Sequence, residues 1–293
     1  MRILDRFAKR VQLQEGIRFL HKEPARPNLG DALCSPKNYF DFSAERPALI
    51  VGGGAFNGLG VNEARHFTGG IRIAWGIGQS WRLEKPAEHL NLRAVRGTFA
   101  IATTRDPQFA NEDVRLLPCV SVLHPVVDIP PGAEHGIFFN HDEAASGEGI
   151  DAIIRDEQES QFVAVNSAPE REFTAAFARA GELTTNSYHA AYWGLLSGRA
   201  VRLLGYSTKF PNLLSLLGLP VDAFTPYHRG DTASLADALK RSGSRPALVL
   251  SDAASIKGRF RAMNHEFAAS LAQLGINAVA RRGRRDFGEL SDT

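Results

Sequence analysis

The chain has 293 residues, 44% of them apolar, and a formal net charge of +2. This length allows a sizeable core and favours two domains over one. The nearly neutral charge balance gives no general argument for nucleic-acid binding, and the dispersed aromatic residues provide no stacking platform for single strands.

The cysteines and the termini indicate the cellular compartment. Cys34 and Cys119 are far apart in the sequence, which predicts reduced thiols rather than a disulfide or a metal site. The N-terminal segment lacks the apolar core of a signal peptide, and no later segment approaches the roughly 18 continuous apolar residues of a membrane span. We therefore expect a cytoplasmic protein. A basic run at 281–285 predicts a solvated tail; peripheral contact with an anionic membrane surface is the alternative.

The first half alternates short apolar runs with glycine-rich turns. We expect strands at 16–20, 48–51 and 71–75, a helix at 31–40, and one more strand and helix at 92–96 and 98–103. This alternation predicts parallel α/β units. The proline-rich segment 124–131 breaks the pattern and predicts a linker.

The same alternation restarts in the second half. We expect strands at 136–140, 162–165, 200–204 and 247–250, and an amphipathic helix over 252–274. The pattern predicts an α/β protein with a first domain of residues 1–128 and a second of residues 129–293. The carboxyl ends of the two sheets would then face a cleft, where ligands of such sheets bind.

The segment 184–199, TTNSYHAAYWGLLSGR, is the most informative part of the chain. Its polar run through Ser187 predicts a helix cap and places His189 in the first turn. Helix N-termini attract anions, so a histidine held there suits phosphate or carboxylate. The alternative is a capped helix whose histidine only fills space.

A second polar motif, NLGD at 28–31, precedes a predicted helix. Asp31 fits the role of an N-cap. It also fits the role of a cleft carboxylate that binds a sugar hydroxyl or acts as a general base.

Two glycine turns follow successive predicted strands. Gly52, Gly53 and Gly54 form the first, and Gly76 and Gly78 belong to the second. Such turns let a backbone approach a ligand closely, although tight strand–helix connections need the same residues. The dinucleotide spacing GxGxxG and the phosphate loop GxxxxGK[ST] are both absent there.

Other polar residues lie at expected strand ends. Arg105 precedes an aspartate and a proline, a pattern typical of an ion pair that pins a turn. Asn140 and His141 end the first strand of the second half, at the level of the cleft. Lys209 is a flexible cation suited to phosphate, or else solvates a helix start. The GxSxG and HExxH motifs of hydrolases and metalloproteases do not occur.

Taken in order, several segments resemble the polysaccharide pyruvyl transferase family. They are NLGD (28–31), LIVGGGAF (49–56), WGIGQS (75–80), TRDPQFA (104–110), LPCVSVLHP (117–125), TTNSYHAAYWGLLSGRAV (184–201) and then Lys209. The resemblance implies two Rossmann-like domains in a GT-B-like arrangement, with the site in the interdomain cleft and no required cofactor or metal. It also implies transfer of pyruvate from phosphoenolpyruvate, as a ketal, to a sugar or lipid-linked saccharide of an exopolysaccharide or cell-surface glycan.

The resemblance also assigns residues. His189 matches the family histidine near phosphoenolpyruvate, and Asp31 matches the aspartate of its NxGD motif, so both are candidate catalytic residues. Two arginines of many members are replaced here by Ser187 and His141. The candidate substrate-binding residues are Asn28, Gly30, Gly53, Gly54, Gly76, Gly78, Arg105, Asn140, His141, Ser187 and Lys209. The alternative functions are a GT-B glycosyltransferase that uses a nucleotide sugar, and a non-catalytic scaffold of glycan assembly.

Overall fold

The computed structural model describes residues 12–14, 16–21, 26–54, 57–83 and 97–281. The segment predicted at 92–96 and most of the basic C-terminal run lie outside these residues. No helix in the described ranges is long and apolar enough to cross a membrane.

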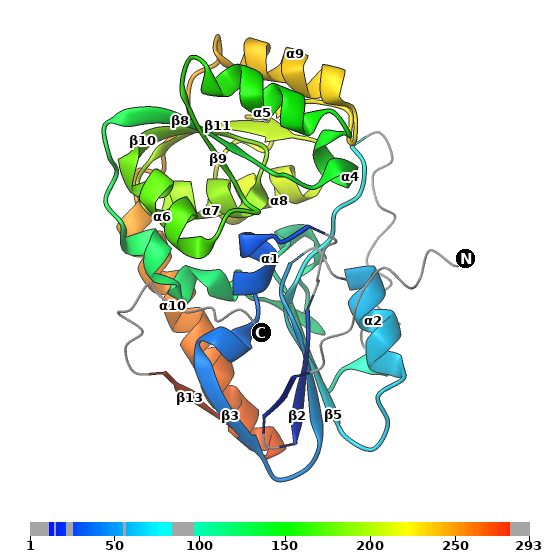
Figure 1. Ribbon diagram of the computed structural model, residues 1–293. Helices are drawn as coiled ribbons and strands as arrows, with labels where there is room; N and C mark the ends of the chain where they lie inside the picture. Colours follow the sequence, from blue (N-terminus) through cyan, green and yellow to red (C-terminus); the bar gives the residue numbers. More distant parts are fainter. Residues whose placement is uncertain (1–11, 15, 22–25, 55–56, 84–96, 282–293) are drawn as a thin grey trace, which may run out of the picture.

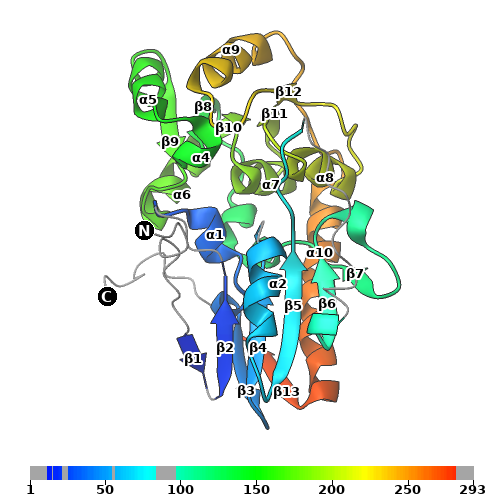
Figure 2. The same cartoon turned by 90° about the vertical axis from the view of Figure 1, so that its right-hand side faces the viewer.

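A mainly parallel sheet forms the first half, with the strand order β1-β2-β4-β5-β6-β7. Its strands are β1 (Gln12–Gln14), β2 (Ile17–Leu20), β4 (Ala48–Gly52), β5 (Ile71–Ile77), β6 (Ile101–Thr104) and β7 (Val114–Leu116). Only the β1–β2 pair is antiparallel. Every residue of β4 is buried, as in a parallel strand that is covered on both faces. Figure 2 shows β2 and β5 pointing toward the other half of the molecule.

The second half contains a parallel sheet with the order β12-β11-β10-β8-β9. Its strands are β8 (Glu134–Phe139), β9 (Phe162–Val165), β10 (Ala180–Thr185), β11 (Ala200–Gly205) and β12 (Thr225–Pro226). The order reverses between β8 and β10, and ligands of doubly wound sheets bind at such a point.

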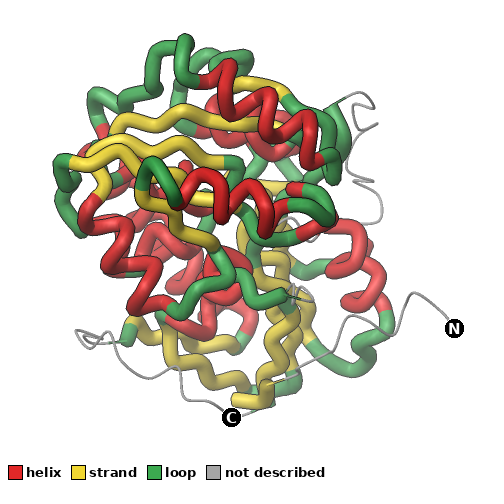
Figure 3. The backbone as a smooth tube through the Cα atoms, turned by 45° about the horizontal axis from the view of Figure 1, so that its top comes forward, coloured by secondary structure: helices red, strands yellow, loops and turns green. Residues whose placement is uncertain are grey.

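Helices cover both faces of the second sheet (Figures 1 and 3). On one face lie α5 (Ile150–Gln158) and α9 (Thr232–Ser242). On the other lie α6 (Glu170–Arg179), α7 (Tyr188–Leu196) and α8 (Lys209–Leu216). The short α4 (Glu143–Ser146) precedes α5. The 3-10 turn η3 (Pro107–Phe109) lies between β6 and β7, whereas η4 (Val120–Leu123) and η5 (Pro125–Asp128) connect the two halves.

Helix α7 lies at the junction of the two halves. All nine of its residues are buried, as expected of a helix that is apolar all round. It packs on β10 and β11, on α8, and on α1 (Leu29–Leu33) of the first half. Gly30 makes the α1–α7 contact close, because a Cβ at that position would lie 2.5 Å from Cγ of His189.

The C-terminal segment returns to the first sheet. Helix α10 (Ala253–Ser270) continues into η6 (Leu271–Leu274) and β13 (Ile276–Ala280), and β13 pairs antiparallel with β3 (Phe40–Ala44). Figure 1 shows α10 running from the upper half along the lower sheet. Phe260 belongs to the core around α7, whereas Phe267 belongs to the core under β4 and β5. The expected second domain, 129–293, thus includes a segment that packs on the first sheet. Helix α2 (Asn57–Arg65) contacts β4.

The structure confirms the α/β class with two largely parallel sheets and corrects some expected elements. The helix predicted at 31–40 is wrong in extent: α1 ends at Leu33, the 3-10 turn η2 (Pro36–Asn38) follows, and β3 begins at Phe40. Pro36 explains the break, because the residue before a proline disfavours helical backbone. The helix predicted at 98–103 is wrong, because β6 begins at Ile101. The strand predicted at 247–250 is only an isolated bridge between Val201 and Leu248.

Candidate functional site

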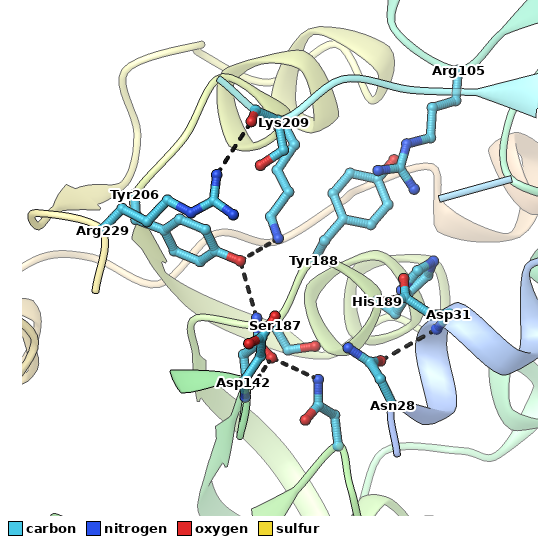
Figure 4. Close-up of a pocket in the computed structure, with 13 residues that line it drawn as sticks. Asn28, Asp31, Arg105, Asp142, Ser187, Tyr188, His189, Tyr206, Lys209 and Arg229 are labelled. Carbon is cyan, nitrogen blue, oxygen red and sulfur yellow. Dashed lines mark hydrogen bonds between the residues drawn. The ribbon is translucent and has the colours of Figure 1, made fainter. Parts of the chain in front are cut away.

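A cavity of about 250 Å³ lies between the two halves (Figure 4). Most of its wall comes from residues that follow the carboxyl ends of strands in both sheets. The lining residues are Asn28, Asp31, Ser80, Arg105, Asn140, Asp142, Asn166, Ser187, Tyr188, His189, Tyr206, Lys209 and Arg229. The cavity therefore lies where the sequence predicted a ligand to bind.

The polar run before α7 caps the helix and ties strand ends together. Ser187 is the N-cap, with its Oγ 3.5 Å from the backbone N of Ala190. Thr185 Oγ1 accepts the Ser187 N–H at 2.9 Å. Asn186 Oδ1 accepts the backbone N–H of Asn140, at the end of β8, at 2.6 Å. The start of α7 is thus fixed relative to the neighbouring strand.

His189 is held by packing on all sides. Its side chain lies 5.5 Å from the Trp193 ring and 5.2 Å from the Tyr188 ring, centroid to centroid. Nε2 lies 3.7 Å from Sγ of Cys119, and the Nδ1 edge faces Gly30. The ring reaches the cavity with only 6% of the residue surface exposed.

Helix α1 brings Asp31 to the same wall. Asn28, not Asp31, is the N-cap: its Oδ1 accepts the Asp31 N–H at 3.2 Å. The Leu29 N–H donates to the carbonyl of Asn166 at 2.7 Å, which joins α1 to the second sheet. Asp31 Oδ1 would lie 3.5 Å from a Cβ on Gly54, whose φ is +70°. The glycine turn therefore leaves room beside this carboxylate.

Two cations enter the cavity from the second half. Lys209 begins α8, and its Nζ donates to the hydroxyl of Tyr206 at 2.5 Å. Arg229, after β12, donates from Nη1 to the carbonyl of Ser80 at 3.4 Å. Burial raises the pKa of Tyr206 above its ordinary value, against the opposing charge of Arg229. Tyr206 therefore stays protonated beside the two cations.

Arg105 supplies a third cation from the first half. Its guanidinium carbon lies 3.9 Å from the centre of the Tyr188 ring, and its Nε lies 4.0 Å from Oδ1 of Asp106. Burial lowers the pKa of Arg105, but Tyr188 and Asp106 more than offset this, so the guanidinium stays charged. Burial raises the pKa of Asp106 to about 6, and the Arg105 charge opposes that rise. The expected ion pair therefore exists, and Arg105 also lines the cavity.

The structure brings together seven of the predicted site residues on the cavity wall: Asn28, Asp31, Arg105, Asn140, Ser187, His189 and Lys209. The predicted glycines shape the site from behind. A Cβ on Gly78 would overlap Arg105 Nε and lie 3.1 Å from its Cζ, and one on Gly53 would lie 2.5 Å from the Cys34 carbonyl oxygen. Gly76 has a φ of +57°, and a Cβ at that position would lie 3.0 Å from the carbonyl oxygen of Leu117.

His141 takes a different place from the one predicted. The described wall of the cavity does not include it. Its Nε2 lies 2.6 Å from Oδ1 of Asp151 and 2.6 Å from Nη1 of Arg26, and its Nδ1 lies 2.6 Å from Oγ of Ser167. Arg26 also binds Glu143 at 2.7 Å. His141 therefore belongs to an ion-pair cluster that fastens the segment before α1 to the second half.

Six lining residues were not among the predicted ones: Ser80, Asp142, Asn166, Tyr188, Tyr206 and Arg229. Asp142 and Tyr188 adjoin predicted residues, and Asn166 directly follows a predicted strand. Ser80 lies two residues after Gly78, and Tyr206 lies two residues after a predicted strand, so these positions held a usable signal. Arg229 had none, because it follows a strand of two residues.

No group of three or more His, Cys, Asp or Glu side chains that would hold a metal gathers within the described ranges. Comparisons of the chain with models of protein families, with curated proteins and with solved structures found no match.

Proposed function

We propose that the chain is a polysaccharide pyruvyl transferase, which moves pyruvate from phosphoenolpyruvate to a sugar as a ketal. The observation that carries the proposal is one cavity with three cations, Arg105, Lys209 and Arg229, beside His189 and Asp31. Phosphoenolpyruvate carries a phosphate and a carboxylate and needs several cationic partners. A buried carboxylate suits the activation of a sugar hydroxyl.

The proposal extends to the arrangement of the two halves of the molecule. We infer that the two sheets are the cores of two Rossmann-like domains in a GT-B-like arrangement, with the boundary near residue 128. The reversal of strand order between β8 and β10 supports this for the second half. The mixed origin of the cavity wall supports a ligand site between the halves.

The proposed reaction starts with protonation of the methylene carbon C3 of phosphoenolpyruvate, which leaves an oxocarbenium-like centre at C2. One sugar hydroxyl attacks C2 and loses its proton. The bond between C2 and the phosphate oxygen then breaks, and a second hydroxyl closes the ketal and loses its own proton. One of these two protons replaces the proton spent on C3, and the other leaves with phosphate. His189 is the candidate acid or phosphate clamp, and Asp31 is the candidate base.

Two guanidinium groups stand in for the family arginines that the sequence lacks. Ser187 and His141 replace those arginines, but Arg105 and Arg229 reach the same cavity from other elements. A guanidinium fork is a strong partner for carboxylate and phosphate. The retained charge supports phosphoenolpyruvate as donor and argues against the scaffold alternative.

The size of the cavity favours a small donor over a nucleotide sugar. Its volume of about 250 Å³ is below the range of about 300–1,000 Å³ usual for pockets that hold drug-sized ligands. Phosphoenolpyruvate has fewer than a third of the atoms of a nucleotide sugar.

Trp81 suits the acceptor. It directly follows Ser80 of the cavity wall and is 49% exposed. Its backbone N–H donates to Thr208 Oγ1 at 3.1 Å, and its carbonyl accepts the Thr208 N–H at 2.9 Å. An indole with an apolar face and a polar edge suits a pyranose ring. We propose that the sugar or lipid-linked acceptor lies against Trp81, with the protein in the cytoplasm at the inner face of the membrane.

The test is phosphate release from phosphoenolpyruvate in the presence of p-nitrophenyl hexosides, with mass spectrometry of the sugar product. We expect a ketal-modified hexoside, and no product from His189→Ala. Binding of a nucleotide sugar without binding of phosphoenolpyruvate would favour the glycosyltransferase, and binding of neither would favour the scaffold.

A further inference from the structure

Two buried polar side chains of the cavity wall, Arg105 and Tyr188, have unused hydrogen-bonding capacity, as does Asp106 behind them. Arg105 Nε and Nη1, Tyr188 Oη and Asp106 Oδ1 are sealed from solvent and have no hydrogen-bond partner among the described residues. The Arg105 side chain is only 1% exposed. A buried donor without a partner costs about 1–3 kcal/mol, and a charged one costs more. Such a cost at a cavity wall indicates groups that are kept for a ligand.

The surrounding residues hold Arg105 in one orientation. Gly78 has no Cβ and so leaves the space that Arg105 Nε occupies, and the guanidinium carbon lies over the Tyr188 ring, 3.9 Å from its centre. Asp106 is itself held, because its Oδ2 accepts the Gln79 N–H at 2.7 Å. Asp106 Oδ1 lies 4.0 Å from Arg105 Nε, which is too far for a hydrogen bond. The ion pair balances charge and leaves the N–H groups of Arg105 available.

We propose that Arg105 and the hydroxyl of Tyr188 form a subsite for a carboxylate of the ligand, separate from a phosphate subsite at Lys209 and Arg229. The identification of this carboxylate with that of phosphoenolpyruvate rests on the proposed function. Figure 4 shows Tyr188 between Arg105 and the pair formed by Lys209 and Tyr206.

The chemistry of Arg105 and Lys209 matches the assignment of carboxylate to one subsite and phosphate to the other. A planar guanidinium presents its donors in the geometry of a carboxylate, whereas a lysine is a point charge suited to phosphate. Burial raises the pKa of Tyr188 above its ordinary value, so its hydroxyl remains a donor. A ligand with both anions would thus be oriented from its two ends.

The test compares ligands that carry one anion or both. Calorimetry at fixed ionic strength would measure phospholactate (carboxylate and phosphate, unreactive), glycerol 2-phosphate (phosphate only) and pyruvate (carboxylate only). The variant Arg105→Lys keeps the charge and loses the fork, and Tyr188→Phe keeps the ring and loses the hydroxyl. Lys209→Met is the reciprocal control, because it removes a cation of the phosphate subsite and leaves Arg105 in place. Circular dichroism checks the fold of each variant.

We expect Arg105→Lys to weaken phospholactate binding about 10- to 100-fold, as for loss of a charged hydrogen-bonded pair. Tyr188→Phe should weaken it less, and neither variant should change glycerol 2-phosphate binding more than about twofold. Lys209→Met should weaken both phosphate ligands. Equal losses for phospholactate and glycerol 2-phosphate in Arg105→Lys, or no loss in either, would overturn the subsite.

The same data separate this inference from the proposed function. If phospholactate binding depends on Arg105 but no ketal forms with any hexoside, the subsite stands and the transferase proposal fails. If a ketal forms and phospholactate binding is independent of Arg105, only the subsite fails. A wild-type protein that binds neither phospholactate nor pyruvate also overturns the subsite.

Discussion

Substitution of Gly30 by alanine tests the contact between α1 and α7 that positions His189. The added Cβ would lie 2.5 Å from Cγ and 2.7 Å from Cβ of His189. Ordinary van der Waals contact begins at 3.4 Å, so relief of the Cγ contact alone requires a separation of about 0.9 Å, and Nδ1 of His189 lies closer still. The clash is with the root of the His189 side chain, which cannot swing aside as a flexible tip would.

Two effects set the magnitude. Overpacking of this kind costs about 1–3 kcal/mol, and replacing a helical glycine returns up to about 1 kcal/mol. We expect a net loss of about 1–2 kcal/mol, or a fall of about 2–6 °C in Tm. If His189 has the proposed catalytic role, its displacement by nearly 1 Å should lower transfer about 100-fold.

Gly258→Ala is the matched control. Gly258 lies inside α10, and a Cβ there meets nothing within 4 Å. Only the helix-propensity gain of about 0.5–1 kcal/mol should remain, so Tm should rise and transfer should not change. Thermal unfolding and ketal formation would be measured for both variants. A Gly30→Ala protein with wild-type Tm and wild-type transfer would refute the close contact.

Three further changes test separate parts of the site. Asp31→Asn should abolish transfer with little change in Tm, because another residue caps α1; equal loss of both would point to a structural role. Trp81→Ala should raise the acceptor KM and leave donor affinity unchanged, since the indole is half exposed; weakened donor binding would contradict this. Because burial raises the pKa of Asp106 to about 6 from 3.8, its protonation stabilises the folded state below pH 4, and this contribution is lost as the pH rises through 6. The wild type should therefore gain up to about 3 kcal/mol of unfolding free energy relative to Asp106→Asn between pH 7 and pH 4, as measured by denaturant unfolding; parallel pH profiles would refute it.

The parts of the site that the sequence predicted depend on local signals. The cap at Ser187 and the first-turn position of His189 follow from a polar run before an apolar helix. Parallel strands with buried residues were recognisable for the same reason, because apolar runs and glycine turns are contiguous in the chain. Since such strands end at one edge of a sheet, the residues after them were expected together, and most of them are.

The parts that the sequence did not predict depend on distant contacts or on side-chain direction. Strands β3 and β13 pair across more than 200 residues, and neither has a strong local pattern. Asn140 and His141 are consecutive, but neighbouring residues in extended chain point to opposite sides. Asn140 therefore faces the cavity, whereas His141 faces Asp151. Arg229 reaches the site only because the sheet order places β12 beside β11.

The return of the C-terminal segment to the first sheet has a consequence for the order of folding during synthesis. Trp75 packs against Phe40 and Phe42 and also against Phe267, which is translated almost 200 residues after Trp75. Domains generally fold in the order of their synthesis. Here the first sheet must wait for α10 and β13, while most of the second core is already complete. We therefore expect the later-synthesised half to fold first and to serve as the platform on which the earlier half closes.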